Sequence, residues 1–178
     1  MAELMIAMAV VAIMAGVGAP SLSKWMDNYR IKAAARELYA DLQLTKMKAI
    51  KKNQPYKILL DWYTDDWSAY YIIQCKKTLN LCWPDGGVYP DDWDYTWHYV
   101  SLDSGGRIVF KHPQGATPIE GQWDTYFGVI TFNPNGTTDG TANVYIANRI
   151  NTKNYRVRIP SRAGAVTVER YDGNGGWQ

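Results

Sequence analysis

The chain opens with a hydrophobic stretch that is followed by a polar, amphipathic one. After Glu3 no charged residue occurs until Lys24, which leaves 20 uncharged residues, Leu4 to Ser23. A helix of this length reaches about 30 Å, the thickness of the hydrocarbon core of a bilayer. The stretch therefore predicts a helix suited to a membrane or to an equally dry protein interior. Glu3 is costly to bury there unless it meets a positively charged partner.

The helical pattern continues to about residue 52. Apolar or small residues recur at alternating spacings of four and three, as on one face of an amphipathic helix: Ile31, Ala35, Leu38, Leu42, Thr45 and Ala49. The basic residues lie mostly off this face. The helix is predicted to end near Asn53, just before Pro55. We expect residues 1–24 to be a hydrophobic anchor and residues 25–178 a globular head, composed of an amphipathic half-helix (25–53) and a β domain (54–178).

After Pro55 the pattern becomes that of short strands separated by turns. Strands are predicted over residues 56–62, 67–75, 97–102, 107–110, 126–132, 142–147, 155–159 and 165–170, with irregular loops over 76–95 and 111–125. In the turn after residue 132, Pro134 presets the backbone and Gly136 can take a positive φ. One long helix followed by such strands predicts an α+β fold in which the helix packs on an antiparallel β-sheet.

The net charge of +2 conceals an acidic region that lies between two basic ones. Residues 24–52 carry eight basic and three acidic residues, residues 61–94 carry seven Asp and two Lys, and residues 149–170 carry six basic residues and one Glu. This separation favours head-to-tail self-association over binding of a generic polyanion.

The N-terminal third resembles the N-terminal helix of type IV pilins and type II secretion pseudopilins. The likeness rests on Glu3-Leu-Met-Ile6, the Ala/Val/Ile run, the Gly-x-Gly-Ala-Pro break at residues 16–20 and the basic amphipathic helix that follows. In the family, four residues separate the leader cleavage site from the acid, whereas Met1 and Ala2 alone precede Glu3 here. Either the sequence is trimmed or its processing differs. An ordinary signal anchor or uncleaved signal peptide is the alternative, although such segments normally begin with basic residues.

The C-terminal third narrows the resemblance to the GspH/FimT branch. Ile130-Thr-Phe-Asn-Pro-Asn-Gly-Thr137 matches its Phe-x-Pro-x-Gly turn between late strands, and Tyr155-Arg-Val-Arg-Ile159 resembles its Gly-Arg-x-Arg segment, with Tyr155 in place of Gly. The resemblance does not extend to residues 61–125.

The resemblance implies a structural subunit of an extracellular type IV pilus-like filament that polymerises through its N-terminal helix. Its alternative is a minor pseudopilin of a type II secretion or DNA-uptake machine. The implied partners are further copies, other pilins or pseudopilins, the assembly machinery, a prepilin peptidase that also methylates the N-terminus, and the bacterial inner membrane before assembly. The subunit then lies in an extracellular filament or periplasmic pseudopilus, with no cofactor. The implied assembly residues are Glu3, Leu4, Ile6, Val10, Val11, Ile13, Gly16, Gly18 and Pro20.

Two further sites follow from the residues in the light of this family. In some members the Gly-Arg-x-Arg region binds DNA, so Arg156 and Arg158, extended by Lys153, Arg162 and Arg149, are a candidate phosphate-binding patch. A polar strand face, or ion pairs with a neighbour, is the alternative. Cys75 and Cys82 are predicted to form a disulfide, as expected in an exported protein, because a zinc site would need two more ligands.

The remaining motifs are weaker. Asp85, Asp91, Asp92 and Asp94 suggest a calcium loop or a solvated one, without EF-hand spacing. The tryptophans form either a carbohydrate-binding or adhesive surface or core and subunit contacts: Trp62, Trp67, Trp83, Trp93, Trp97 and Trp123. Asn135-Gly-Thr137 is a glycosylation sequon where a host has the enzyme. The sequence contains no Gly-rich phosphate loop, no supported Ser/His/Asp set and no carboxylate pair, so we predict that the protein is not an enzyme.

Overall fold

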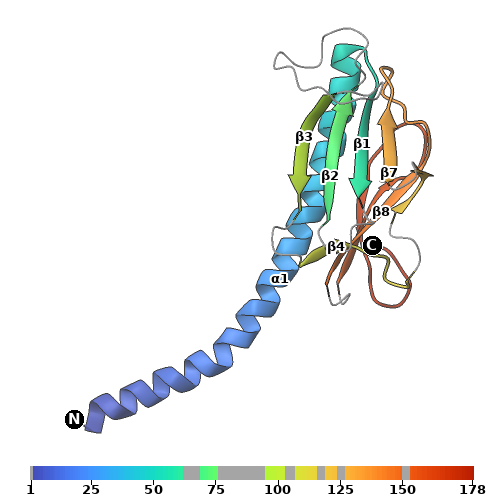
Figure 1. The fold of residues 1–178 in the computed structure, drawn as a ribbon. Helices are drawn as coiled ribbons and strands as arrows, with labels where there is room; N and C mark the ends of the chain where they lie inside the picture. The colour runs from blue at the N-terminus through green and yellow to red at the C-terminus, as the bar shows by residue number, and fades with distance from the viewer. Residues whose placement is uncertain are drawn as a thin grey trace. The chain divides into compact units, whose positions relative to one another are not determined.

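The computed structural model describes residues 2–61, 69–75, 95–102, 107–115, 119–123, 127–149 and 153–178. Within these ranges it describes the backbone but not the side chains of residues 2, 15–24, 61, 70, 95–99, 122, 123 and 127. One helix, α1 (Ala2–Lys52), precedes all the strands (Figure 1). The chain divides into two compact units, Met1–Arg30 and Ile31–Gln178. The helix α1 therefore contributes its first part to one unit and its second part to the other.

In the described part of the second unit, residues 31–178, the strands form two antiparallel sheets. The first has the strand order β3-β2-β1-β7-β6, and the second has the order β10-β9-β8-β4, with β5 paired to β8. The strands are β1 (Tyr56–Asp61), β2 (Tyr70–Cys75), β3 (Tyr95–Ser101), β4 (Ile108–Phe110), β5 (Ile119–Glu120), β6 (Gln122–Trp123), β7 (Phe127–Phe132), β8 (Ala142–Asn148), β9 (Asn154–Ile159) and β10 (Thr167–Arg170). The predicted α+β fold, a helix with antiparallel sheets, is confirmed.

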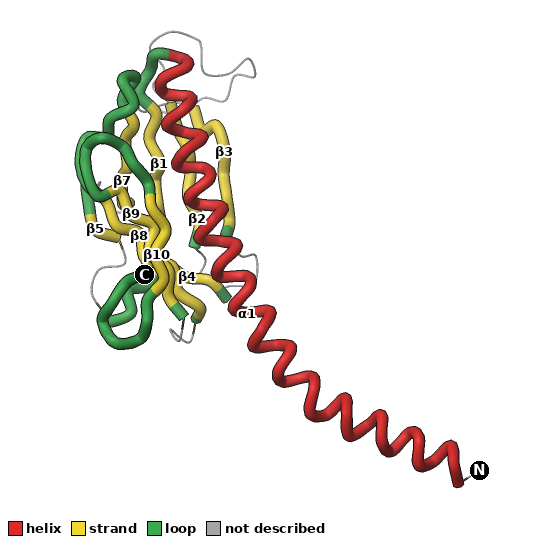
Figure 2. The backbone as a smooth tube through the Cα atoms, turned by 180° about the vertical axis from the view of Figure 1, so that it is seen from behind, coloured by secondary structure: helices red, strands yellow, loops and turns green. Residues whose placement is uncertain are grey.

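The second part of α1 lies along the sheets and shares their core (Figure 2). The predicted apolar face is confirmed, because each of its six residues is at most 1% exposed: Ile31, Ala35, Leu38, Leu42, Thr45 and Ala49. The Thr45 hydroxyl donates a hydrogen bond to the carbonyl oxygen of Asp41 at 2.6 Å. A polar residue therefore fits this buried face without an unpaired group.

A partly buried hydrogen bond connects α1 to the first sheet. The Tyr71 side chain is 0% exposed, and its hydroxyl donates to Asp41 Oδ2 at 2.6 Å. Burial, and next this hydrogen bond, raise the pKa of Tyr71 far above its ordinary value. The hydroxyl therefore stays protonated and keeps donating to the Asp41 carboxylate over the whole physiological pH range.

The helix ends where the sequence predicts, at a left-handed residue. Asn53 has a φ of 51°, and the amides of Asn53 and Gln54 donate to the carbonyl oxygens of Ile50 and Ala49 at 3.2 and 3.1 Å. Asparagine tolerates this conformation at a helix C-terminus better than most residues do. Pro55 then starts the extended chain that becomes β1.

The predicted loop over residues 111–125 is wrong in part, because it contains the short strands β5 and β6. Each has two residues, too few to show an alternating pattern, and each depends on a partner distant in sequence: β5 pairs with β8 and β6 with β7. Gly121, with a φ of 152°, separates the two strands and lets the chain pass from one sheet to the other. Tertiary pairing rather than local propensity forms both strands.

The turn after β7 has the predicted conformation. Gly136 has a φ of 79°, and its amide donates to the carbonyl oxygen of Asn133 at 2.9 Å. The Asn135 side chain is exposed, and its Oδ1 accepts hydrogen bonds from the amide and hydroxyl of Thr137 at 3.1 and 2.7 Å. The sequon asparagine is therefore at the surface of a well-formed turn.

Candidate assembly helix and arginine face

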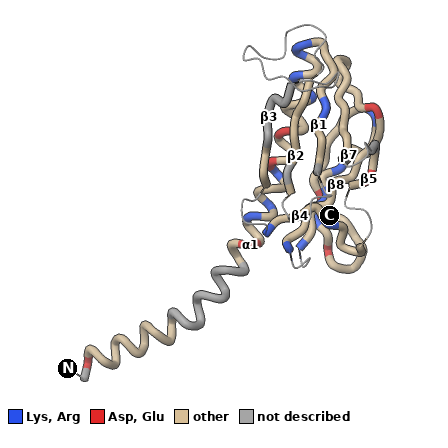
Figure 3. The backbone as a smooth tube through the Cα atoms, in the orientation of Figure 1, with Lys and Arg blue, Asp and Glu red and all other residues tan. Residues whose placement is uncertain are grey.

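The first part of α1 exposes a continuous set of large apolar side chains, here called the apolar segment, Leu4–Met14. Eight of them are between 47% and 75% exposed: Leu4, Met5, Ile6, Met8, Val10, Val11, Ile13 and Met14. Between Glu3 and Met14 no residue carries a charge (Figure 3). Apolar exposure on this scale marks a surface that another protein or a membrane covers.

The acid at the start of this segment is in the first turn of α1, and its side chain is exposed. A carboxylate at this position is stabilised by the positive end of the helix dipole. The five predicted apolar assembly residues lie on the same segment, C-terminal to Glu3: Leu4, Ile6, Val10, Val11 and Ile13. The predicted positions Gly16, Gly18 and Pro20 lie where side chains are not described. Among the described residues, no helix meets the length and hydropathy of a membrane span.

Further along α1, but still in the first unit, two aromatic side chains are exposed. Trp25 and Tyr29 are 64% and 66% exposed, and their rings stack with centroids 6.1 Å apart. Asp27 and Arg30 form a surface ion pair at 3.6 Å. The stacked pair extends the set of exposed apolar side chains on this helix beyond the apolar segment.

The predicted arginine patch lies on β9, which pairs with β10 in antiparallel register. Arg156 is opposite Glu169, and Arg158 is opposite Thr167. Arg156 Nε donates to Glu169 Oε2 at 3.0 Å, Arg156 Nη2 contacts the same oxygen, and Arg158 Nη1 lies 3.9 Å from Glu169 Oε1. Both arginines thus project from one face of the strand, as their alternation predicts. We call this pair and Glu169 the arginine face.

Arg156 is held on several sides. Its guanidinium lies 4.5 Å from the ring centroid of Trp177, a cation–π contact. Desolvation lowers the pKa of Arg156, but hydrogen bonds with Glu169 and Tyr145 outweigh it and raise the pKa overall. Only 14% of the Arg156 side chain is exposed, against 42% for Arg158. The Arg156 guanidinium is therefore mainly engaged in the ion pair with Glu169.

Tyr145 and Trp177, which contact this arginine, belong to a cluster of aromatic rings from three segments. Tyr145 of β8 packs edge-on against His112 at 4.3 Å between centroids, and Trp177 lies 5.5 Å from Tyr145 and 5.1 Å from Tyr171. The bridge between Tyr171 and Trp177 folds the C-terminal residues into this position. Sequence reasoning missed Glu169, Tyr145 and Trp177, because only the strand register brings them to Arg156.

We predict that Arg156→Ala lowers the free energy of unfolding by about 1.5–3 kcal/mol, because it removes the guanidinium that hydrogen-bonds the Glu169 carboxylate and leaves the longer 3.9 Å contact with Arg158. Arg158→Ala removes the same charge from a more exposed position and is expected to cost less than about 1 kcal/mol. Urea unfolding of the full-length chain and of both variants, followed by Trp fluorescence, measures the difference. Equal effects of the two substitutions would show that Arg156 has no special structural role.

The other predicted patch residues are exposed. Lys153 precedes β9, and its amide donates to Asn148 Oδ1 at 3.0 Å, while the Arg162 carbonyl oxygen accepts from the Thr138 amide at 2.9 Å. Both side chains reach solvent, and Arg149 is exposed as well. Among the described cations of this region, Lys153 and Arg162 are therefore more exposed to solvent than Arg156.

Several sequence predictions fall on residues whose structure is not described. Cys75 is fully buried at the end of β2 and is disulfide-bonded, but its predicted partner Cys82 lies outside the described residues. The acidic loop Asp85, Asp91, Asp92 and Asp94 and the tryptophans Trp62, Trp67, Trp83 and Trp93 lie there too, and Trp97 and Trp123 have no described side chain. In the described part of the chain, no three His, Cys, Asp or Glu side chains gather as metal ligands would.

A long N-terminal helix with an exposed apolar segment, followed by antiparallel sheets that pack on its second part, is the architecture of the pilin-like subunits. Within that class the chain belongs to the family of the type II transport protein GspH, whose family profile matches residues 34–164. The predicted resemblance to the GspH-like branch is confirmed by this match. The matched range begins within α1 and includes the turn at residues 133–137 and the arginine motif on β9.

Similar solved structures come from two bacteria. The type IV minor pilin FimU of Pseudomonas aeruginosa is 18% identical, with 82% of this chain and 92% of that chain covered and a TM-score of 0.49. The minor pseudopilin EpsH from the Type 2 Secretion System of Vibrio cholerae is 14% identical, with coverages of 78% and 95% and a TM-score of 0.47. A search of curated proteins found no significant match.

Proposed function

We propose that this chain is a structural subunit of an extracellular type IV pilus-like filament and that it polymerises through the first part of α1. The observation that carries the proposal is the apolar segment, Leu4–Met14, with eight large side chains at least 47% exposed. Burying apolar surface contributes about 25 cal/mol per Å², so packing these helices together in a filament core would supply the main free energy of assembly. Before assembly the same side chains would be covered by the inner membrane.

The family match supports a second candidate, a minor pseudopilin of a type II secretion or DNA-uptake machine. In this case the chain would still assemble through α1, but in few copies and with other pseudopilins. A DNA-binding role for the arginine motif is the less favoured part of this candidate, because Arg156 is engaged by Glu169 and Trp177. Neither candidate calls for a catalytic residue, and we propose no enzymatic activity.

The test is electron microscopy of filaments sheared from producing cells, combined with mass spectrometry of their protein. We expect this chain to be the dominant protein of the filaments, and its intact mass to give the mature N-terminus and any methylation. A trace amount would make it a minor subunit. Filaments without this chain, together with no recovery of it in a secretion pseudopilus, would contradict both candidates.

A further inference from the structure

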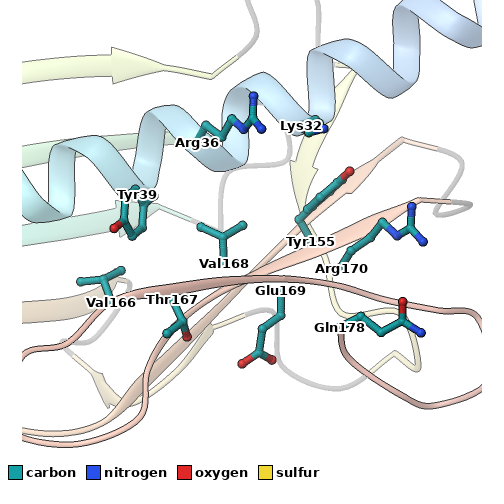
Figure 4. Close-up of a pocket in the computed structure, with 10 residues that line it drawn as sticks. All are labelled: Lys32, Arg36, Tyr39, Tyr155, Val166, Thr167, Val168, Glu169, Arg170 and Gln178. Carbon is teal, nitrogen blue, oxygen red and sulfur yellow. The ribbon is translucent and has the colours of Figure 1, made fainter.

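A groove in the second unit lies between α1 and the edge of the second sheet. It has a volume of about 650 Å³ and is lined from α1 by Lys32, Arg36 and Tyr39, and from the sheet side by Tyr155, residues 166–170 and Gln178 (Figure 4). Among the described strands, β10 pairs with β9 alone, so it is an edge strand. The volume is that of a small-ligand site and suits a few side chains of an extended peptide. We call this the basic groove.

The charge of the basic groove is positive. Lys32, Arg36 and Arg170 are exposed. Along the C-terminal strand the side chains alternate, so that Val166 and Val168 point toward α1 while Thr167 and Glu169 point to the opposite side (Figure 4). The Glu169 carboxylate is there bound by Arg156. Glu169 is thus a carboxylate among the described lining residues, but its charge is turned away from α1 and is bound by Arg156, so the three cations face the groove without it.

The floor between these cations is apolar and aromatic. Val166 is 7% exposed, and Tyr39, Tyr155 and Val168 are half-buried at the edge of the core. An occupant that uses both features must carry several negative charges and at least one aromatic or branched side chain. An extended segment can also add main-chain hydrogen bonds to an edge strand such as β10.

The chain itself contains a segment of this chemistry. Residues 85–94 carry four Asp and no Lys or Arg, and they include Val88, Tyr89 and Trp93. A subunit whose chain contains both a basic groove and an acidic segment can form the same heterologous contact with each successive copy. Electrostatic complementarity of this kind selects the partner and fixes its register.

We propose that the basic groove binds the acidic segment, residues 85–94, of a second copy of this chain. This inference rests on the proposed function, because it supplies a contact between heads in addition to the burial of α1. It assigns Lys32, Arg36 and Arg170 as the residues that recognise the neighbouring head.

The test uses the full-length chain in detergent micelles and a fluorescein-labelled peptide of residues 85–94, with binding followed by fluorescence anisotropy. We expect saturable binding that the triple variant Lys32→Glu, Arg36→Glu, Arg170→Glu weakens by about tenfold or more. The matched control changes three surface cations outside both the groove and the arginine motif, Lys51→Glu, Lys52→Glu and Lys111→Glu, and is expected to retain binding within about threefold. A peptide with Asn in place of its four Asp residues is expected not to bind.

Three outcomes overturn the inference. The first is absence of peptide binding, and the second is equal weakening by the two triple variants, which would indicate only the overall field of the protein. The third is that a DNA oligonucleotide or a phosphatidylglycerol vesicle competes as well as the peptide does, which would assign the groove to phosphate groups.

Filament assays separate this inference from the proposed function. If wild type and the groove variant enter filaments equally, the head contact is wrong and the filament role stands. If the wild-type chain never enters filaments although the peptide binds to its groove, the filament role is wrong.

Discussion

Glu3→Ala is expected to abolish assembly of the chain into filaments. Glu3 is an exposed carboxylate directly before the apolar segment, so any packing that buries this segment brings the carboxylate into a dry environment. An unpaired buried charge costs several kcal/mol, so the assembled state must provide a positive partner, for which the N-terminal amine of the adjacent subunit is suited. Removing one member of such a pair costs about 3–5 kcal/mol, or about two to four orders of magnitude in the affinity of each addition.

Two further variants make this prediction specific for charge. Glu3→Gln keeps the size of the side chain and loses its charge, so it is expected to fail as Glu3→Ala does. Asp27→Ala removes a carboxylate from the same helix, but from a surface ion pair worth less than about 1 kcal/mol, and is expected to assemble. Filament counts by electron microscopy, normalised to the amount of each variant in cells, give the result. Normal filaments from the Glu3→Ala variant would contradict the pairing of Glu3 with the N-terminal amine of the adjacent subunit.

The helix and its packing face could be predicted from the sequence because their signals are local. The spacing of Ile31 to Ala49 specifies one face of a helix, and any sheet that covers this face buries the same six residues. The left-handed position of Gly136 follows equally from a short turn motif. Such elements can be predicted without knowing which residues distant in sequence they contact.

The environment of the arginine motif could not be predicted in the same way. The alternation of Arg156 and Arg158 places them on one face, but it contains no information on what lies opposite. Glu169 reaches Arg156 only through the register of β9 and β10, and Trp177 only through the fold of the C-terminal residues. The same applies to the basic groove, which is lined by cations that are distant in sequence, Lys32 and Arg36 near the start of the chain and Arg170 near its end. For sites of this kind the chemistry depends on long-range pairing.

Gly164→Ala is expected to lower the free energy of unfolding by about 3 kcal/mol or more. Gly164 has a φ of 68°, which already disfavours a side chain, and an added Cβ would lie 2.4 Å from the carbonyl oxygen of Gly136. This contact joins the loop after β9 to the turn after β7. Lys46 of α1 anchors the same loop by donating from Nζ to the carbonyl oxygens of Gly164 and Ala163 at 3.0 and 3.4 Å. Because the obstructing atom is a backbone oxygen, the chain must shift to admit the methyl group.

Gly115→Ala is the matched control that separates backbone strain from steric conflict. Gly115 has a φ of 77°, close to that of Gly164, but in the described part of the chain no atom beyond its neighbours in sequence lies within 4 Å of its added Cβ. It is therefore expected to show only the cost of a left-handed alanine, about 1–2 kcal/mol. Urea unfolding of the full-length variants gives the comparison. If the two variants lose equal stability, the junction between the two loops yields easily. If Gly164→Ala loses clearly more, close backbone packing at this junction requires a residue without a side chain.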